Sequence, residues 1–86
     1  MTDMTIGKVA DVVGVGVETI RFYERRKLIE QPPRRREGGY RIYSDTTVKR
    51  LHFIRRAQEL GFSLREIAEL LALRDAESNQ ADASDV

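Results

Sequence analysis

The sequence contains no cysteine and no tryptophan, and it has a single histidine, His52. Without cysteine there is no disulfide, no reactive thiolate and no Cys-based zinc or mercury site among these 86 residues. One histidine cannot form a metal site by itself. We therefore expect no metal ion or other cofactor in this chain.

Long hydrophobic runs are missing as well. No apolar run approaches the length of a membrane span, and the N-terminus lacks the apolar core of a signal peptide. Charged residues make up 34% of the chain, which leads us to expect a soluble, cytoplasmic protein with one modest core. We do not expect an enzyme, because there is no Ser/His/Asp set, no phosphate-cradling glycine loop and no pair of carboxylates suited to a cleft.

The charges that are present are segregated along the chain. The formal net charge is only +1, but residues 21–56 hold twelve Lys or Arg against four Asp or Glu. The segments before and after this stretch are both net acidic. A solvated surface without a partner usually mixes its signs, so the positive middle favours a polyanionic partner such as nucleic acid.

Residues 6–28 contain the pattern around which the rest is organised. Apolar residues recur at helical spacing in Ile6, Val9, Ala10 and Val13, and Gly14-Val15-Gly16 then interrupts the pattern. A second helix is predicted over residues 17–27. Two short helices joined by a glycine-containing turn are typical of a helix-turn-helix, in which the second helix enters a DNA major groove.

Two residues of this region allow two interpretations each. Thr5 is an N-cap for the first helix or a phosphate contact at its positive end. Tyr23 is a core aromatic residue or a phosphate donor, and both roles are compatible because its ring is apolar and its hydroxyl polar. Arg21 and Arg25 lie four residues apart, a spacing that favours an anion between them.

Residues 30–43 predict a basic hairpin. Pro32-Pro33 forces an extended path, and Gly38-Gly39 then lies between a run of three arginines, 34–36, and the run Tyr40 to Tyr43. Ile42 alternates with Arg41 and Tyr43, so we expect one face of the second strand inward and one outward. We interpret the hairpin as a wing that grips the DNA backbone; the alternative is a solvated loop.

Two further helices are predicted. Ser44 caps the first of them, on which Arg55 or Arg56 could add a phosphate contact. Ser63 and Glu66 form a capping box for the last helix. Its apolar edge from Leu64 to Leu73 is either core or a docking face. After Arg74 the composition turns polar and acidic, and we expect this tail to be mobile.

Four segments together resemble the N-terminal domain of the MerR family of bacterial transcription regulators. They are residues 6–10, residues 17–24, Gly39-Tyr-Arg-Ile-Tyr43 and Leu60-Gly-Phe-Ser-Leu-Arg-Glu-Ile67, and the resemblance covers residues 5–74. It implies a winged helix-turn-helix in which Arg21 and Tyr23 contact operator DNA. It also implies that Tyr40 and Arg41 in the wing clamp neighbouring phosphates.

The resemblance also implies how an intact regulator works. Members act as homodimers on a palindromic site in an over-long promoter spacer, and they distort this spacer so that RNA polymerase can use the promoter. The sequence is most similar to the metal-responsive members, including mercury-resistance regulators. It departs from them by ending before the long dimerisation helix and by lacking the cysteines of the sensors. A truncated domain is therefore expected rather than a short natural variant, with the metal ion or other effector bound in the missing region.

The sequence thus predicts a mainly α winged helix-turn-helix domain over residues 1–74, followed by an acidic tail over 75–86. Its predicted function is to bind double-stranded promoter DNA; the alternative is a protein-interaction module that docks a partner helix through Leu64–Leu73. Activation or repression, and the oligomeric state of this fragment, stay open. The predicted DNA-binding residues are Thr5, Glu18, Thr19, Arg21, Tyr23, Arg34, Arg35, Tyr40, Arg41 and Arg55.

Overall fold

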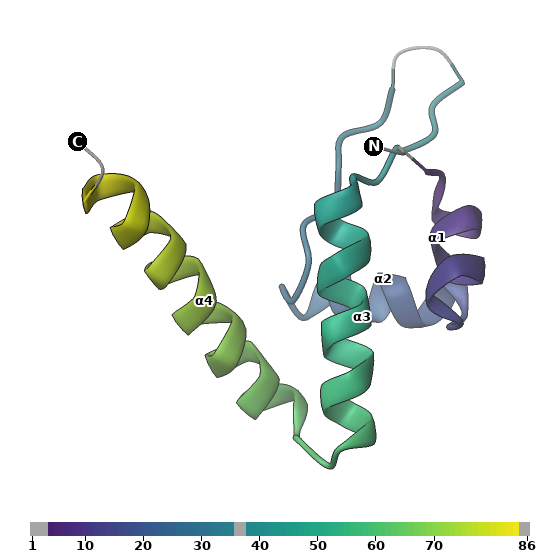
Figure 1. Cartoon of the computed structure of the whole chain (residues 1–86). Coiled ribbons are helices and arrows are strands. Elements are labelled where there is room, and N and C mark those ends of the chain that lie inside the picture. Colours follow the sequence, from purple (N-terminus) through teal and green to yellow (C-terminus); the bar gives the residue numbers. More distant parts are fainter. Residues whose placement is uncertain (1–3, 36–37, 85–86) are drawn as a thin grey trace. The chain divides into compact units, whose positions relative to one another are not determined.

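The computed structural model describes residues 4–35 and 38–84, with side chains described as far as residue 77. Helices in this part of the chain are α1 (Ile6–Val13), α2 (Val17–Arg25), α3 (Asp45–Glu59) and α4 (Leu64–Ser84) (Figure 1). The mainly helical class is therefore confirmed. The chain divides into two compact units, residues 1–55 and 56–86, which are described separately below. No helix in the described residues is both long and apolar enough to span a membrane.

The pair α1 and α2 in the first unit forms as predicted. Gly14 ends α1 with a left-handed φ of 82°, and its amide donates to the carbonyl oxygen of Ala10 over 2.8 Å. Glycine adopts this conformation without the steric penalty of a Cβ. Gly16 is the extended N-cap of α2. Figure 1 shows the two helices meeting at this short turn.

The end of α2 differs from the prediction. The helix stops at Arg25 rather than at residue 27, because Lys27 has a left-handed φ of 62° that no helix can continue. The amide of Leu28 then donates to the carbonyl oxygen of Tyr23 over 3.0 Å. This turn directs Leu28 and Ile29 into the core, where both are buried.

The predicted two-stranded wing is not formed as a sheet. The described residues of this segment contain only isolated bridges, Arg34 with Arg41 and Met4 with Tyr43. Pro32 and Pro33 lack an N–H donor, so neither can donate a hydrogen bond to a partner strand, and the observed bridge of this arm is at Arg34. The chain still reverses at Gly38 and Gly39, which have positive φ angles of 82° and 66°. Arg36, the third arginine of the run, lies outside the described residues.

The core of the first unit is built from all its elements. The inward-facing residue of the second arm is Tyr43, which is 1% exposed, whereas Ile42 is only half-buried. Helix α3 contributes three buried apolar residues, Val48, Leu51 and Ile54. The buried apolar residues of this unit are Val9, Ala10, Val13, Ile20, Tyr23, Leu28, Ile29, Tyr43, Val48, Leu51 and Ile54.

The second unit contains the end of α3 and all of α4. The predicted capping box is confirmed: the Ser63 amide donates to Glu66 Oε1 over 2.8 Å, and the Glu66 amide donates to Ser63 Oγ over 3.1 Å. Hydrogen bonds from the backbone and the side chain of Ser63 to the Glu66 carboxyl hold its pKa below the usual value. The sequence predicts a mobile tail beyond Arg74, and this prediction is wrong for the described residues. The tail is helical, because α4 continues to Ser84. Residues 85 and 86 lie outside the described part.

Candidate nucleic-acid interface

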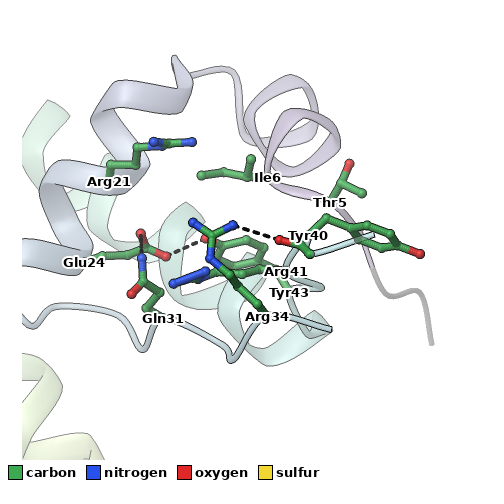
Figure 2. A pocket seen from close by; sticks show the side chains of 10 residues that line it. Thr5, Ile6, Arg21, Glu24, Gln31, Arg34, Tyr40, Arg41 and Tyr43 are labelled. Atoms are coloured by element: carbon green, nitrogen blue, oxygen red, sulfur yellow. Dashed lines mark hydrogen bonds between the residues drawn. The ribbon is translucent and has the colours of Figure 1, made fainter. Parts of the chain in front are cut away.

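A pocket of about 280 Å³ lies in the first unit, between α2, the start of α1 and the segment in which the chain turns back. We call this segment, residues 31–35 and 38–43, the reversing segment. Five of the predicted DNA-binding residues line it, namely Thr5, Arg21, Arg34, Tyr40 and Arg41. Figure 2 shows Arg21 reaching this opening from α2, with Arg34 and Arg41 approaching from the segment that follows. The sequence interpretation requires helix and wing arginines on one surface, and the structure brings them to one pocket.

The reversing segment is held by its own hydrogen bonds. Arg34 Nη1 donates to the carbonyl oxygen of Gly39 over 2.8 Å, and the Arg35 amide donates to the carbonyl oxygen of Tyr40 over 2.8 Å. The Arg35 side chain is exposed, and the Tyr40 side chain is half-exposed. The bond to Gly39 uses only Nη1 of the Arg34 guanidinium, so the other N–H donors of this side chain stay available to an anion.

Arg41 has an unusual position for a charged residue. Its Nε is buried and has no hydrogen-bond partner among the described residues, and the residue as a whole is half-buried at the pocket wall. A buried donor without an acceptor raises the free energy of the folded state. An acceptor entering the pocket would therefore interact favourably with Arg41.

The lining of the pocket includes a carboxylate that sequence reasoning missed. Glu24, from α2, is 9% exposed, and its Oε2 accepts a hydrogen bond from the Tyr43 hydroxyl over 2.6 Å. Its Oε1 accepts a weaker bond from Gln31 Nε2 over 3.3 Å. A signal did exist, because Glu24 follows Val17 by seven residues and Ile20 by four, which places it on the apolar face of the helix.

The pKa of Tyr43 reflects this arrangement. Burial raises it above its usual value, and the hydrogen bond to Glu24 and the charge of Glu24 raise it further. The positive charges of Arg41 and Arg21 act in the opposite direction. Both arginines therefore lie close enough to Tyr43 to influence the same hydroxyl, in agreement with their place at the pocket.

The other predicted residues lie outside this pocket. Glu18 is exposed and Thr19 half-buried on the first turn of α2. Tyr23 is 4% exposed, so its ring has the core role, and burial raises its pKa while Arg55 opposes that shift. Arg55 donates to the carbonyl oxygen of Val13. Thr5, by contrast, lines the pocket and is at the N-cap of α1, where it makes no side-chain capping bond. Contact of these residues with DNA remains a prediction.

Two short helices around a glycine turn, with a positive pocket beside the second helix, define a helix-turn-helix domain. Residues 4–73 match the family described as MerR HTH family regulatory protein. The chain belongs to this family of transcription regulators. The match favours DNA recognition over the alternative of an interaction module, and it indicates no enzyme class.

The relatives include regulators of mercury-resistance operons. The mercuric resistance operon regulatory protein of Bacillus cereus is 60% identical over 70 residues, which are 81% of this chain and 52% of that protein. The HTH-type transcriptional regulator ZntR of Escherichia coli (strain K12) is 46% identical over 69 residues, 80% of this chain and 48% of that protein. The chain thus spans about half the length of the curated relatives it matches.

Solved structures share the fold. The transcription regulator PbrR691 from Ralstonia metallidurans CH34, in complex with lead(II), matches with a TM-score of 0.76 and 37% identity, covering 93% of this chain and 64% of that chain. HiNmlR, a MerR family regulator lacking the sensor domain and bound to promoter DNA, matches with a TM-score of 0.69. Its identity is 24%, so this second likeness shows the fold alone.

Proposed function

We propose that this chain is the operator-binding domain of a bacterial MerR-type regulator. In this proposal α2 enters the major groove of duplex DNA, with Glu18, Thr19 and Arg21 nearest the base edges. The observation that carries it is the pocket where Arg21 of α2 meets Arg34 and Arg41 of the reversing segment. A backbone phosphate is an anion of the size and charge that this site favours.

The reversing segment serves as the wing in this proposal. Extended β pairing is not required for that role, because Gly38 and Gly39 turn the chain and the bridge between Arg34 and Arg41 fixes its two arms. Arg34, Arg35, Tyr40 and Arg41 then contact phosphates on either side of the groove. Such contacts set the register and orientation of α2 on the duplex, and sequence is read by α2 itself.

The mode of regulation is carried over from the family resemblance. We propose that the intact protein works in the cytoplasm as a homodimer on a palindromic site, and that it distorts an over-long promoter spacer for RNA polymerase. Contacts at both ends of the site would offset the free energy needed to deform its centre. The metal-linked names of the relatives suggest that the effector is a metal ion.

The residues described here do not fit such an effector. The chain has no cysteine, and its described residues contain no group of three His, Cys, Asp or Glu side chains that could hold a metal ion. Soft metal ions such as mercury and lead prefer thiolate ligands. We therefore propose that effector binding uses residues outside these 86.

The groove assignment is tested by Arg21→Ala in a gel-shift titration. The probe is the duplex that the wild-type chain selects from a random-sequence pool. We expect a loss of about 1–3 kcal/mol in binding free energy, the usual range for a good base contact. The matched control is Arg65→Ala, which removes the same charge from an exposed position on α4. Equal binding by wild type and Arg21→Ala would refute the assignment.

The wing assignment predicts a different pattern. Arg35→Ala should weaken binding to selected and unrelated duplexes by the same factor, because phosphates carry no sequence information. It should also reduce the slope of log affinity against log salt concentration by about one. Loss of selectivity without a change in this slope would place Arg35 at a base edge instead.

A further inference from the structure

Glu24 is a buried acidic residue within residues 21–56, the stretch of the sequence rich in Lys and Arg. Burial of a carboxylate is unfavourable unless hydrogen bonds or opposite charges compensate it. Glu24 has both, since it accepts bonds from Tyr43 and Gln31 and lines the same pocket as Arg21, Arg34 and Arg41. Its side chain is among those that line the pocket (Figure 2) and is only 9% exposed, so it is poorly placed to reach a duplex.

The short bond between Glu24 and Tyr43 joins the two DNA-facing parts of the first unit. Glu24 follows Arg21 on α2 by three residues, which places the two on adjacent turns. Tyr43 follows Arg41 by two residues. Tyr43 is itself fixed, because its amide donates to the carbonyl oxygen of Met4 over 2.7 Å and its own carbonyl accepts from the Met4 amide over 3.1 Å. The bond therefore ties the Arg21 turn of α2 to the arm that carries Arg41.

The carboxylate also balances charge within the pocket. Three guanidinium groups line this small volume, and like charges in a partly buried site repel strongly. Arg41 adds a buried Nε without a hydrogen-bond partner in the described part of the chain. A negative charge in the same pocket lowers their mutual repulsion before any phosphate arrives. The pocket keeps an excess of positive charge, and this excess is what a duplex would meet.

We propose that Glu24 is a positioning residue for DNA binding, which acts through Tyr43 to hold Arg21 and Arg41 at a fixed spacing without contacting DNA itself. The inference rests on the proposed function of the domain. Two cationic groups held in advance at the right spacing lose less conformational entropy on binding than two mobile ones. Loss of the hydrogen bond between Tyr43 and Glu24 should therefore weaken DNA binding although both arginines remain present.

The test uses Tyr43→Phe, which removes only the donor hydroxyl, together with Glu24→Ala and Glu24→Gln. Binding is measured by fluorescence anisotropy on the duplex selected by the wild-type chain, over a series of KCl concentrations. The temperature is one at which circular dichroism shows every variant to be folded. We expect Tyr43→Phe and Glu24→Ala to raise Kd about tenfold, within the range for one good contact, and to lower the salt slope by about one.

Glu24→Gln provides rescue by a conservative change. The glutamine carbonyl can still accept from Tyr43, so we expect this variant to bind more tightly than Glu24→Ala. Any remaining difference from the wild type then measures the loss of the balancing charge. The matched control for stability alone is Ile54→Val, which shortens a buried side chain of the same unit away from the pocket. It should lower the unfolding temperature and leave the salt slope unchanged.

A measurement without DNA completes the test. In amide NMR spectra, Tyr43→Phe should shift or broaden the signals of residues 21–24 and 40–42 and leave those of residues 7–12 in place. The inference is overturned if these signals are unchanged, or if the wild-type slope survives in Tyr43→Phe and Glu24→Ala. A wild-type chain that selects no duplex would refute the proposed function. The NMR result would still decide whether the hydrogen bond between Glu24 and Tyr43 holds α2 to the arm that carries Arg41.

Discussion

The guanidinium of Arg55 on α3 donates a hydrogen bond to the carbonyl oxygen of Val13, the last residue of α1. The last carbonyls of a helix have no partner within the helix, and a cation there also interacts favourably with the helix dipole. Arg55 additionally opposes the effect of burial on the pKa of Tyr23, so its charge also lies near α2. A residue predicted as a phosphate contact thus fixes the first unit internally.

We predict that Arg55→Ala lowers the free energy of unfolding by about 1.5–3 kcal/mol, the range for a hydrogen bond that involves a charged group. Urea denaturation followed by circular dichroism measures this change. Arg56→Ala is the matched control, because Arg56 is the neighbouring exposed residue that the sequence left as an alternative. Equal effects of the two substitutions would show that the bond to Val13 contributes nothing.

Gly14 and Gly7 give opposite predictions for the same substitution. Gly14 has a φ of 82°, and a Cβ at this position would meet the guanidinium of Arg55, so Gly14→Ala should destabilise the fold by about 1–2 kcal/mol or more. Gly7 lies inside α1 with open space around it. Gly7→Ala should stabilise the fold by about 0.5–1 kcal/mol. Thermal unfolding of both variants checks the pair, and a shift in the same direction for both would contradict the prediction.

The features that the sequence predicted correctly depend on local chemistry. Gly14 ends α1 through its left-handed φ of 82°, and Gly16 is the extended N-cap of α2. The capping box of Ser63 and Glu66 spans only three residues. Such signals need no knowledge of the rest of the molecule, and the three-residue turn of the helix-turn-helix follows from them.

The features that the sequence missed depend on contacts between distant segments. The bond between Glu24 and Tyr43 spans nineteen positions, and only the folded unit brings the two together. Helix α4 continues past Arg74 for a different reason. Residues 75–84 contain three alanines and neither glycine nor proline, so nothing in them ends a helix that has already begun. A polar and acidic composition alone therefore does not end a helix.

Lys27 offers a way to stabilise the domain. It is the non-glycine residue with a positive φ among the described positions, at 62°, where a side chain brings its Cβ close to the following carbonyl. We predict that Lys27→Gly raises the free energy of unfolding by up to about 1 kcal/mol, since relief of this strain exceeds the added entropy of the unfolded chain. Lys27→Ala removes the same charge and keeps the strain. Unfolding curves in urea that coincide for the two variants would exclude strain as the cause.

The Tyr43 hydroxyl predicts how stability depends on alkaline pH. Its pKa is raised above the usual value of 10.0, first by burial and then by Glu24. Between the usual and the raised pKa, the unfolded chain loses a proton that the folded chain keeps, so the free energy of unfolding must fall as pH rises above about 10. Below that pH the contribution is fully present. We predict that Tyr43→Phe shows a shallower decline of the urea midpoint between pH 8 and pH 11, values chosen about this usual pKa. The control is Tyr40→Phe, which removes a hydroxyl from a half-exposed side chain and should keep the wild-type decline. If the urea midpoint declined equally with pH in all three proteins, the hydroxyl of Tyr43 would ionise as freely in the folded chain as in the unfolded one.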